Sequence, residues 1–138
     1  MQIKLNPITK EEIHKLANTL LIYSILRPEI IEKIKDPQER STWVDSLAVA
    51  AYAIAMQKAG KTISDIADAI GRTEATIRRH LSKETEAGKI VWETYEKLAR
   101  GEEIELAYPV EGGISKDKIK EIITKLESIV EELKKLVE

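Results

Sequence analysis

The stretch from Thr62 to Glu84 constrains the fold more than any other part of this chain of 138 residues. It reads TISDIADAIGRTEATIRRHLSKE, and apolar residues recur at helical spacing on either side of Gly71. Thr62 precedes the first run and Thr73 precedes the second, and threonine is a favoured residue at a helix N-terminus. The sequence therefore predicts two short helices joined by a tight turn.

Residues around this turn have the sizes that two crossing helices require. Ala67 is small where the second helix is expected to cross the first, and Gly71 can adopt the left-handed backbone of a tight turn. Ile77, six residues after Gly71, is placed to lock the second helix onto the first. This spacing predicts a helix-turn-helix unit.

The outer face of the second helix is expected to be basic. If Ile77 and Leu81 point inward, the residues that face outward are Ala75, Arg78, Arg79 and Ser82. Between residues 72 and 83 four basic side chains accompany one acid, a local charge of +3 in a chain whose net charge is −2. Arginine can bind a guanine edge with two hydrogen bonds, so we expect Arg78 and Arg79 to contact bases. The residues expected to contact phosphates are Arg72, Thr73, Thr76 and Lys83.

The segment resembles the helix-turn-helix of transcriptional regulators in the pattern Ile63…Ala67…Gly71-Arg72-Thr73…Thr76-Ile77-Arg78-Arg79-His80-Leu81. The resemblance covers about 22 of the 138 residues. It implies that the second helix, over 73–84, enters the major groove of double-stranded DNA. The full set of expected DNA-contacting residues is Arg72, Thr73, Glu74, Ala75, Thr76, Arg78, Arg79, Ser82 and Lys83.

The segment after the second helix departs from winged-helix regulators, in which a strand and a basic hairpin come after a pair such as Ala87-Gly88. Here residues 93–100 are helical in character, and residues 102–105 are acidic where a wing would meet phosphates. A wholly helical unit without a wing, similar to the DNA-binding region of bacterial sigma factors, is therefore expected. The block through residues 98–102 also resembles archaeal probable regulatory proteins found beside KaiC-like ATPases.

Other start and stop signals predict helices along the rest of the chain. Thr9 and Glu12 have the spacing of a capping box, and the apolar stripe after them ends at Arg27-Pro28. Pro28 opens a short helix that ends near Asp36, and Asp36-Pro37 begins a long one that runs to Ala59. The second helix of the helix-turn-helix is expected to continue to Gly88, and a further helix to end at Gly101.

Two short segments in which apolar and other residues alternate suggest a minor pair of strands, the one expected departure from helical structure. Ile3 and Leu5 alternate near the N-terminus, as do Ile104, Leu106 and Tyr108 in the expected linker.

The last helix is expected to start at a Ser115 cap and to be amphipathic. Its apolar residues occupy the first, fourth and fifth positions of three heptads, namely Ile119, Ile122, Ile123, Leu126, Ile129, Val130, Leu133, Leu136 and Val137. This stripe is wider than the seam of a two-stranded coiled coil and suits a helical bundle. Two alternatives remain open: the helix folds back on its own chain, or it associates with other copies.

These signals predict an all-α protein with a central helix-turn-helix and a C-terminal amphipathic helix. The expected division is an N-terminal helical part over 1–60, a DNA-binding unit over 61–101, a linker over 102–114 and an assembly helix over 115–138.

Composition excludes several classes of protein. The chain has no Cys, so it has neither a disulfide framework nor a thiolate metal site. No apolar run reaches the roughly 18 residues of a membrane span, and no signal peptide is visible, so a cytoplasmic location is expected. Abundant Glu, Ile and Lys favour a thermophilic source.

Candidate catalytic and metal sites have simpler explanations. Residues 55–62 end like a phosphate-binding loop, but the first glycine of that motif is Ala55 and the preceding segment is helical. Glu11 and His14 have the spacing of one half of a di-iron site, whose second half is missing. Trp43 and Trp92 are expected to be core anchors. No cofactor and no enzymatic activity is expected.

The sequence thus predicts a DNA-binding transcriptional regulator that acts as a homo-oligomer, with a dimer favoured. One short basic helix makes few phosphate contacts, so a pair of helices on two half-sites is expected. The alternative is a non-enzymatic adaptor that docks on a KaiC-like ATPase or on the transcription machinery. The net charge of −2 and the acidic residues 102–105 favour that alternative.

Overall fold

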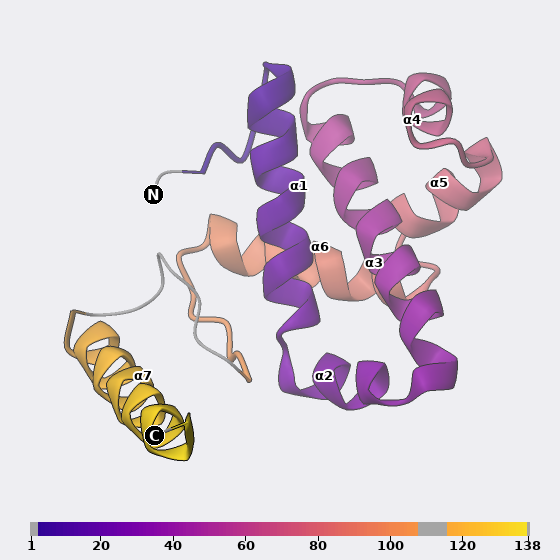
Figure 1. Ribbon diagram of the computed structural model, residues 1–138. Helices are drawn as coiled ribbons and strands as arrows, with labels where there is room; N and C mark the ends of the chain where they lie inside the picture. Colours follow the sequence, from indigo (N-terminus) through magenta and orange to yellow (C-terminus); the bar gives the residue numbers. More distant parts are fainter. Residues whose placement is uncertain (1–2, 108–115, 138) are drawn as a thin grey trace. The chain divides into compact units, whose positions relative to one another are not determined.

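A computed structural model describes residues 3–107 and 116–137, with the backbone alone at 116–119 and 122. All elements in these ranges are helices, and no described residue is in a strand. The helices are α1 (Lys10–Ile25), α2 (Pro28–Lys35), α3 (Pro37–Lys58), α4 (Ile63–Ile70), α5 (Glu74–Leu81), α6 (Glu86–Ala99) and α7 (Lys116–Val137), as labelled in Figure 1. The all-α class is confirmed.

The predicted start signals of the first three helices are confirmed. Thr9 and Glu12 form the reciprocal capping box at α1, Pro28 is the first residue of α2, and the Asp36 side chain accepts the Gln38 N–H at the start of α3. Such caps satisfy backbone N–H groups that have no partner within the helix.

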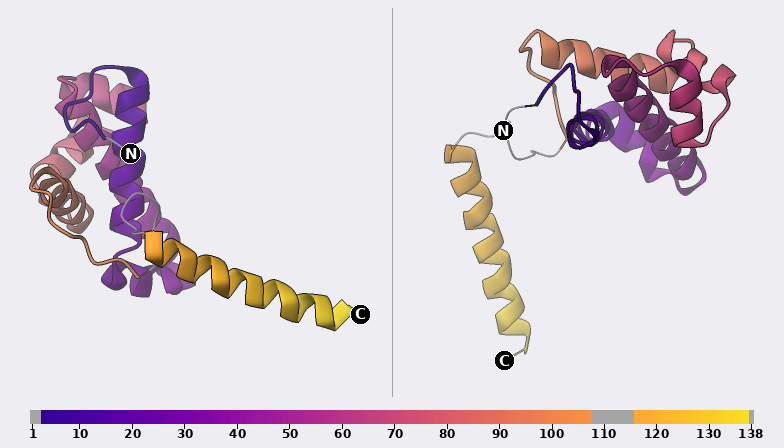
Figure 2. Two further views of the ribbon diagram at one scale, coloured as in Figure 1. Left: turned by 90° about the vertical axis from the view of Figure 1, so that its left-hand side faces the viewer. Right: turned by 90° about the horizontal axis from the view of Figure 1, so that it is seen from above.

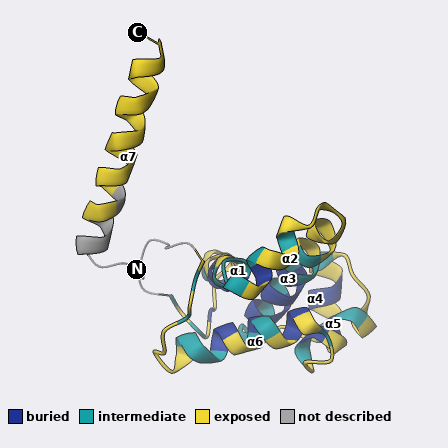
Figure 3. Ribbon diagram, turned by 90° about the horizontal axis from the view of Figure 1, so that it is seen from below, coloured by how far each residue is buried: buried dark blue, intermediate teal, exposed yellow. Residues whose placement is uncertain are grey.

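The chain divides into two compact units, Met1–Ala107 and Tyr108–Glu138. Helix α3 is the centre of the first unit and packs against α1, α2, α4, α5 and α6. Figures 1 and 2 show α6 crossing on one side of α1 and α3. Figure 3 shows the buried residues in dark blue on α1, α3, α4 and α6, among others. Helix α3 has 22 residues and is buried over most of its central part, and it thus packs against every other helix of the unit.

The main core lies between α1, α2, α3 and α6. Leu16, Leu20, Leu47, Ile54 and Val91 are fully buried in it. The apolar stripe predicted for α1 is buried, and Ser24 is buried beside it.

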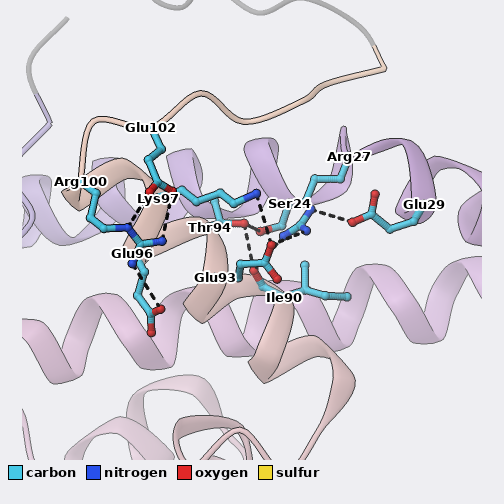
Figure 4. A network of polar contacts seen from close by, with 10 residues as sticks. All are labelled: Ser24, Arg27, Glu29, Ile90, Glu93, Thr94, Glu96, Lys97, Arg100 and Glu102. Atoms are coloured by element: carbon cyan, nitrogen blue, oxygen red, sulfur yellow. Dashed lines mark hydrogen bonds and ion pairs between the residues drawn. The ribbon is translucent and has the colours of Figure 1, made fainter.

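One buried and one exposed polar contact fix α6 against the end of α1 (Figure 4). The hydroxyls of Ser24 and Thr94 lie 3.0 Å apart in the interior, and Arg27 reaches the Glu93 carboxylate at 3.0 Å. Partial burial raises the pKa of Glu93, but Arg27 and Lys97 outweigh it and hold that pKa below its usual range. These contacts also support the helix-turn-helix, because α6 packs against α5.

The predicted strand pairing is wrong for the residues that the structure describes. Residues 102–106 form no ladder, and Ala107 donates its N–H to the Leu26 carbonyl at 2.7 Å. The Leu5 carbonyl instead accepts the Tyr95 hydroxyl at 2.9 Å. Each segment is therefore hydrogen-bonded to groups at the helices rather than to the other segment. Tyr108, the last residue of the expected strand, lies outside the described residues.

Helix α7 has one apolar face, which is exposed. The described large residues of this face are between 48% and 86% exposed: Ile123, Leu126, Ile129, Val130, Leu133, Leu136 and Val137. The expected cap Ser115 and the side chains of Ile119 and Ile122 lie outside the described residues. None of the described helices combines the length and the apolar composition needed to cross a membrane.

Candidate nucleic-acid interface

Helices α4 and α5 form the helix-turn-helix. The Thr62 hydroxyl accepts the Asp65 N–H at 3.1 Å to begin α4, and the Thr73 hydroxyl accepts the Thr76 N–H at 3.1 Å to begin α5. Between the helices Gly71 has a φ of 76°, in the left-handed region where a side chain is unfavourable. Both caps and the glycine turn agree with the sequence prediction.

A second, smaller core packs this pair of helices against α3. Ile66 and Ala67 of α4 and Ile77 of α5 pack with Val49 and Ala53 of α3. The roles of Ala67 and Ile77 were predicted from the sequence, but those of the two α3 residues were not. The signal was a line of apolar residues at 49, 53 and 56, beside those that face the main core.

The expected extent of the second helix is wrong. Helix α5 ends at Leu81 rather than reaching Glu84 or Gly88. Lys83 has a φ of 66°, and the Glu84 N–H bonds back to the Arg79 carbonyl at 2.9 Å, which closes the helix end. No glycine marks this stop, so the sequence pattern predicts a longer helix.

Tertiary contacts explain this stop. The indole N–H of Trp92 donates to the Leu81 carbonyl at 2.9 Å, and Thr85 caps α6 by accepting the Gly88 N–H at 2.9 Å. Gly88 lies inside the first turn of α6, where a Cβ atom would be 2.3 Å from the His80 carbonyl oxygen. Its absence of a side chain therefore lets α6 approach the end of α5.

The predicted interface residues lie together on the outer side of this unit. Thr76 is half-buried and the others are exposed: Arg72, Thr73, Glu74, Ala75, Arg78, Arg79, Ser82 and Lys83. Ile77 is fully buried on the opposite side of α5, so the helix has an inner apolar face and an outer polar face.

Carboxylates from three elements neutralise most of the basic side chains in this set. The ion pairs are Arg72 with Asp45 of α3 at 2.8 Å, Arg78 with Glu74 of α5 at 3.5 Å, and Lys83 with Glu96 of α6 at 3.0 Å. Among the described residues, no acid lies within ion-pair distance of Arg79. Asp45 and Glu96 were not predicted from the sequence, because they lie far from their partners along the chain.

These ion pairs are solvated and therefore weak. The paired side chains are between 41% and 60% exposed. Exposed pairs of this kind contribute about 0–1 kcal/mol, so an incoming phosphate can replace the carboxylate at little cost. Arg79 can bind an anion directly. Arg72, Arg78 and Lys83 can bind one after it replaces their carboxylate partners.

His80 lies at the base of the interface and is buried. Its Nδ1 atom lies 2.7 Å from the Thr85 hydroxyl, which also caps α6. Burial lowers the pKa of His80, and the charge of Arg79 lowers it further, against a smaller opposing effect of Asp45. A neutral imidazole thus links the end of α5 to the start of α6.

Other residues singled out in the sequence have structural roles. Gly60 follows α3 with a φ of 84° and Thr62 caps α4, which explains the residues that resemble a phosphate-binding loop. His14 lies against Tyr52, with its Nδ1 atom 3.0 Å from the phenol oxygen. Trp43 and Trp92 pack against the main core but are only half-buried.

Comparisons with known proteins agree with this geometry. Residues 50–137 match the model of a family described as a helix-turn-helix domain. An uncharacterized protein of Methanocaldococcus jannaschii, a thermophilic archaeon, is 52% identical over 139 residues, which cover 96% of this chain and 84% of that protein. That source fits the thermophilic composition. No solved structure matches the chain.

Proposed function

The chain belongs to the helix-turn-helix domain family, and on this basis we propose that it is a DNA-binding transcriptional regulator whose helix α5 enters the major groove. One observation carries the proposal. Arg79 is exposed on the outer face of α5 and has no acidic partner among the described residues, while the inner face of that helix is buried. The helix is therefore held rigidly and presents a cation that no described residue of its unit neutralises.

Each residue of the interface has a proposed role. Arg78 and Arg79 contact base edges, and Arg72 and Lys83 contact phosphates on either side of the groove. Thr73 and Thr76 place the N-terminus of α5 near a phosphate, where its free N–H groups and dipole favour negative charge. Glu74, Ala75 and Ser82 lie exposed on the same surface and limit which bases fit.

We also propose that α7 joins copies of the chain, with a dimer favoured. The apolar face of this helix continues over three heptads in the sequence, and its described side chains are exposed, so a second copy of α7 is its proposed partner. In a two-fold dimer the two α5 helices would bind half-sites about one helical turn apart. A role of this kind is non-enzymatic and belongs in the cytoplasm. We propose further that the DNA-binding unit has no wing and is similar to the DNA-binding region of bacterial sigma factors.

A second candidate is an adaptor that docks on a KaiC-like ATPase or on the transcription machinery without contacting bases. The observation that favours it is the neutralisation of Arg72, Arg78 and Lys83 by carboxylates. Such a surface suits a protein partner as well as it suits DNA.

Selection of bound fragments from random DNA, followed by binding titrations at several salt concentrations, separates the two candidates. For a DNA-binding regulator, affinity falls steeply with salt because counterions are released from the phosphates. Replacing Arg79 by alanine then lowers the affinity for the selected sequence by about tenfold, since a good arginine–guanine contact contributes roughly 1–3 kcal/mol.

Lys33→Ala on α2 is the matched control, because it removes the same charge from an exposed position outside the interface. An adaptor would yield no enriched sequence, and its weak DNA binding would respond equally to both substitutions.

A further inference from the structure

A groove of about 560 Å³ lies between α1, α3 and α4, apart from the outer face of α5. Ile13 of α1, Met56 of α3 and Ile70 of α4 are among its apolar lining residues. Ile8 stands at its edge and is 80% exposed, although isoleucine is one of the residues most often buried. The volume is within the range of roughly 300–1,000 Å³ that is typical of small-molecule sites.

Two unpaired ammonium groups line this groove. Lys10 is the first residue of α1 and Lys61 lies between α3 and α4, and neither forms an ion pair with any residue that the structure describes. Most basic side chains of the same unit do have acidic partners, for example Lys4, Lys89 and Arg100. Asp65 is the one acid in the lining, so the groove carries an excess of positive charge.

One wall of the groove is polar and rigid. The Nδ1 atom of His14 lies 3.0 Å from the Tyr52 hydroxyl oxygen, and the two rings meet edge to face with their centroids 5.5 Å apart. The Tyr52 hydroxyl also lies 3.4 Å from Oδ1 of Asn18. These contacts hold two aromatic rings in place beside the apolar floor, where they offer both contact area and hydrogen-bonding atoms.

We propose that this groove binds a small amphipathic carboxylate. Its apolar part would lie on Ile13, Met56 and Ile70, and its carboxylate would lie between the ammonium groups of Lys10 and Lys61. A neutral apolar molecule would leave both ammonium groups without a counter-charge, and a polyanion would meet Asp65 and an apolar floor. The site is independent of DNA binding, although Asp65, Ala69 and Ile70 belong to α4, so a ligand there would touch the helix-turn-helix.

Titration of the isotope-labelled full chain with octanoate, followed by two-dimensional amide NMR, tests the proposal. Octanoate is expected to shift the signals of residues 8–14, 61–65 and 69–70 saturably. Octanol and octyltrimethylammonium, which have the same apolar chain, are expected to bind more weakly. Replacing both Lys10 and Lys61 by glutamine lowers the octanoate affinity about fivefold, as the loss of two partly solvated ion pairs requires.

Lys15→Gln combined with Lys33→Gln is the matched control, since both residues are exposed lysines that do not line the groove. Ala69→Trp fills the groove from an exposed position on α4 and is expected to abolish binding while the amide spectrum stays that of a folded chain. The proposal is overturned if no saturable shift occurs, if the shifts are confined to α7, if octanol binds as tightly as octanoate, or if the two lysine pairs respond equally.

Discussion

In the helix-turn-helix, Ile66 and Ile77 are fully buried, whereas on α7 Leu126 and Leu133 remain 56% and 55% exposed. The first region satisfies its apolar side chains with α3 of its own unit and presents charges to the solvent. The second region, α7, presents its apolar side chains to the solvent. The two regions should therefore respond to different substitutions: charge changes on α5 should alter binding, and apolar changes on α7 should alter assembly.

The largest effect is expected from Leu126→Asp combined with Leu133→Asp on α7. Buried carboxylates would prevent the apolar faces from packing, so the oligomer should dissociate in a sedimentation experiment. Affinity for DNA with two half-sites should fall about 100-fold, because the second half-site is no longer bound intramolecularly. Ser128→Asp, at an exposed position outside the apolar stripe, is the control. A wild-type chain that sediments as a monomer would contradict the assembly role.

Gly88→Ala tests the contact that ends the helix-turn-helix. The added Cβ atom would lie 2.3 Å from the His80 carbonyl oxygen, so α5 and α6 must move apart. We expect the free energy of unfolding of the compact unit to fall by about 2 kcal/mol, as for an overpacked core. Denaturant unfolding measures it, with the exposed neighbour Lys89→Ala as control. An unchanged midpoint would mean that the two helices do not need this close approach.

Lys83→Gly should separate stability from binding. Lys83 has a left-handed backbone, which costs an ordinary residue about 1–2 kcal/mol, while glycine loses about 0.5–1 kcal/mol of entropy on folding. The variant should therefore be more stable by about 0.5 kcal/mol and yet bind DNA more weakly, with a salt dependence reduced by about one phosphate contact. Thermal unfolding and salt titration together measure both changes. If stability rises while DNA binding is unaffected, Lys83 is not part of the interface.

Removing the acids that neutralise the interface should increase DNA affinity. Asp45→Asn frees Arg72, and Glu74→Gln frees Arg78. Each change should raise affinity by about two- to threefold, since an exposed pair contributes a few tenths of a kcal/mol up to about 1 kcal/mol. Glu103→Gln, an exposed acid outside the interface, is the control. An adaptor docking through this surface would show no such gain on DNA.

The smallest expected effect is a dependence of stability on pH that comes from His80. Its pKa is lowered in the folded state by burial and by Arg79, so the unfolded chain binds the proton more readily. The stabilisation from neutral His80 is therefore complete above its pKa in the unfolded chain, about 6.5, and is lost as the pH falls toward its lower pKa in the folded chain. Thermal unfolding at several pH values should show this loss in His14→Gln but not in His80→Gln. An identical profile in both variants would refute the assignment.

Much of the helical pattern could be predicted because its causes are local. The caps Thr9, Asp36, Thr62 and Thr73 act on N–H groups two or three residues away, so short stretches of sequence reveal them. Gly71 is similar, since a left-handed turn favours glycine wherever it occurs.

The end of α5 and the neutralisation of its surface could not be predicted in this way. Lys83 adopts a left-handed backbone where a glycine would be expected, and Gly88, which looked like a helix stop, lies inside α6. Asp45 and Glu96 reach the interface from α3 and α6, and local patterns cannot pair residues so far apart in the sequence.

Residues close together in the chain thus specify where most helices of this protein start, because a capping side chain and the backbone it satisfies are covalent neighbours. The packing of α3 and α6 against α5 decides the length of that helix, the burial of His80 and the pairing of Arg72 and Lys83 with distant acids. Those properties depend on atoms that only the folded chain brings within a few ångströms of one another.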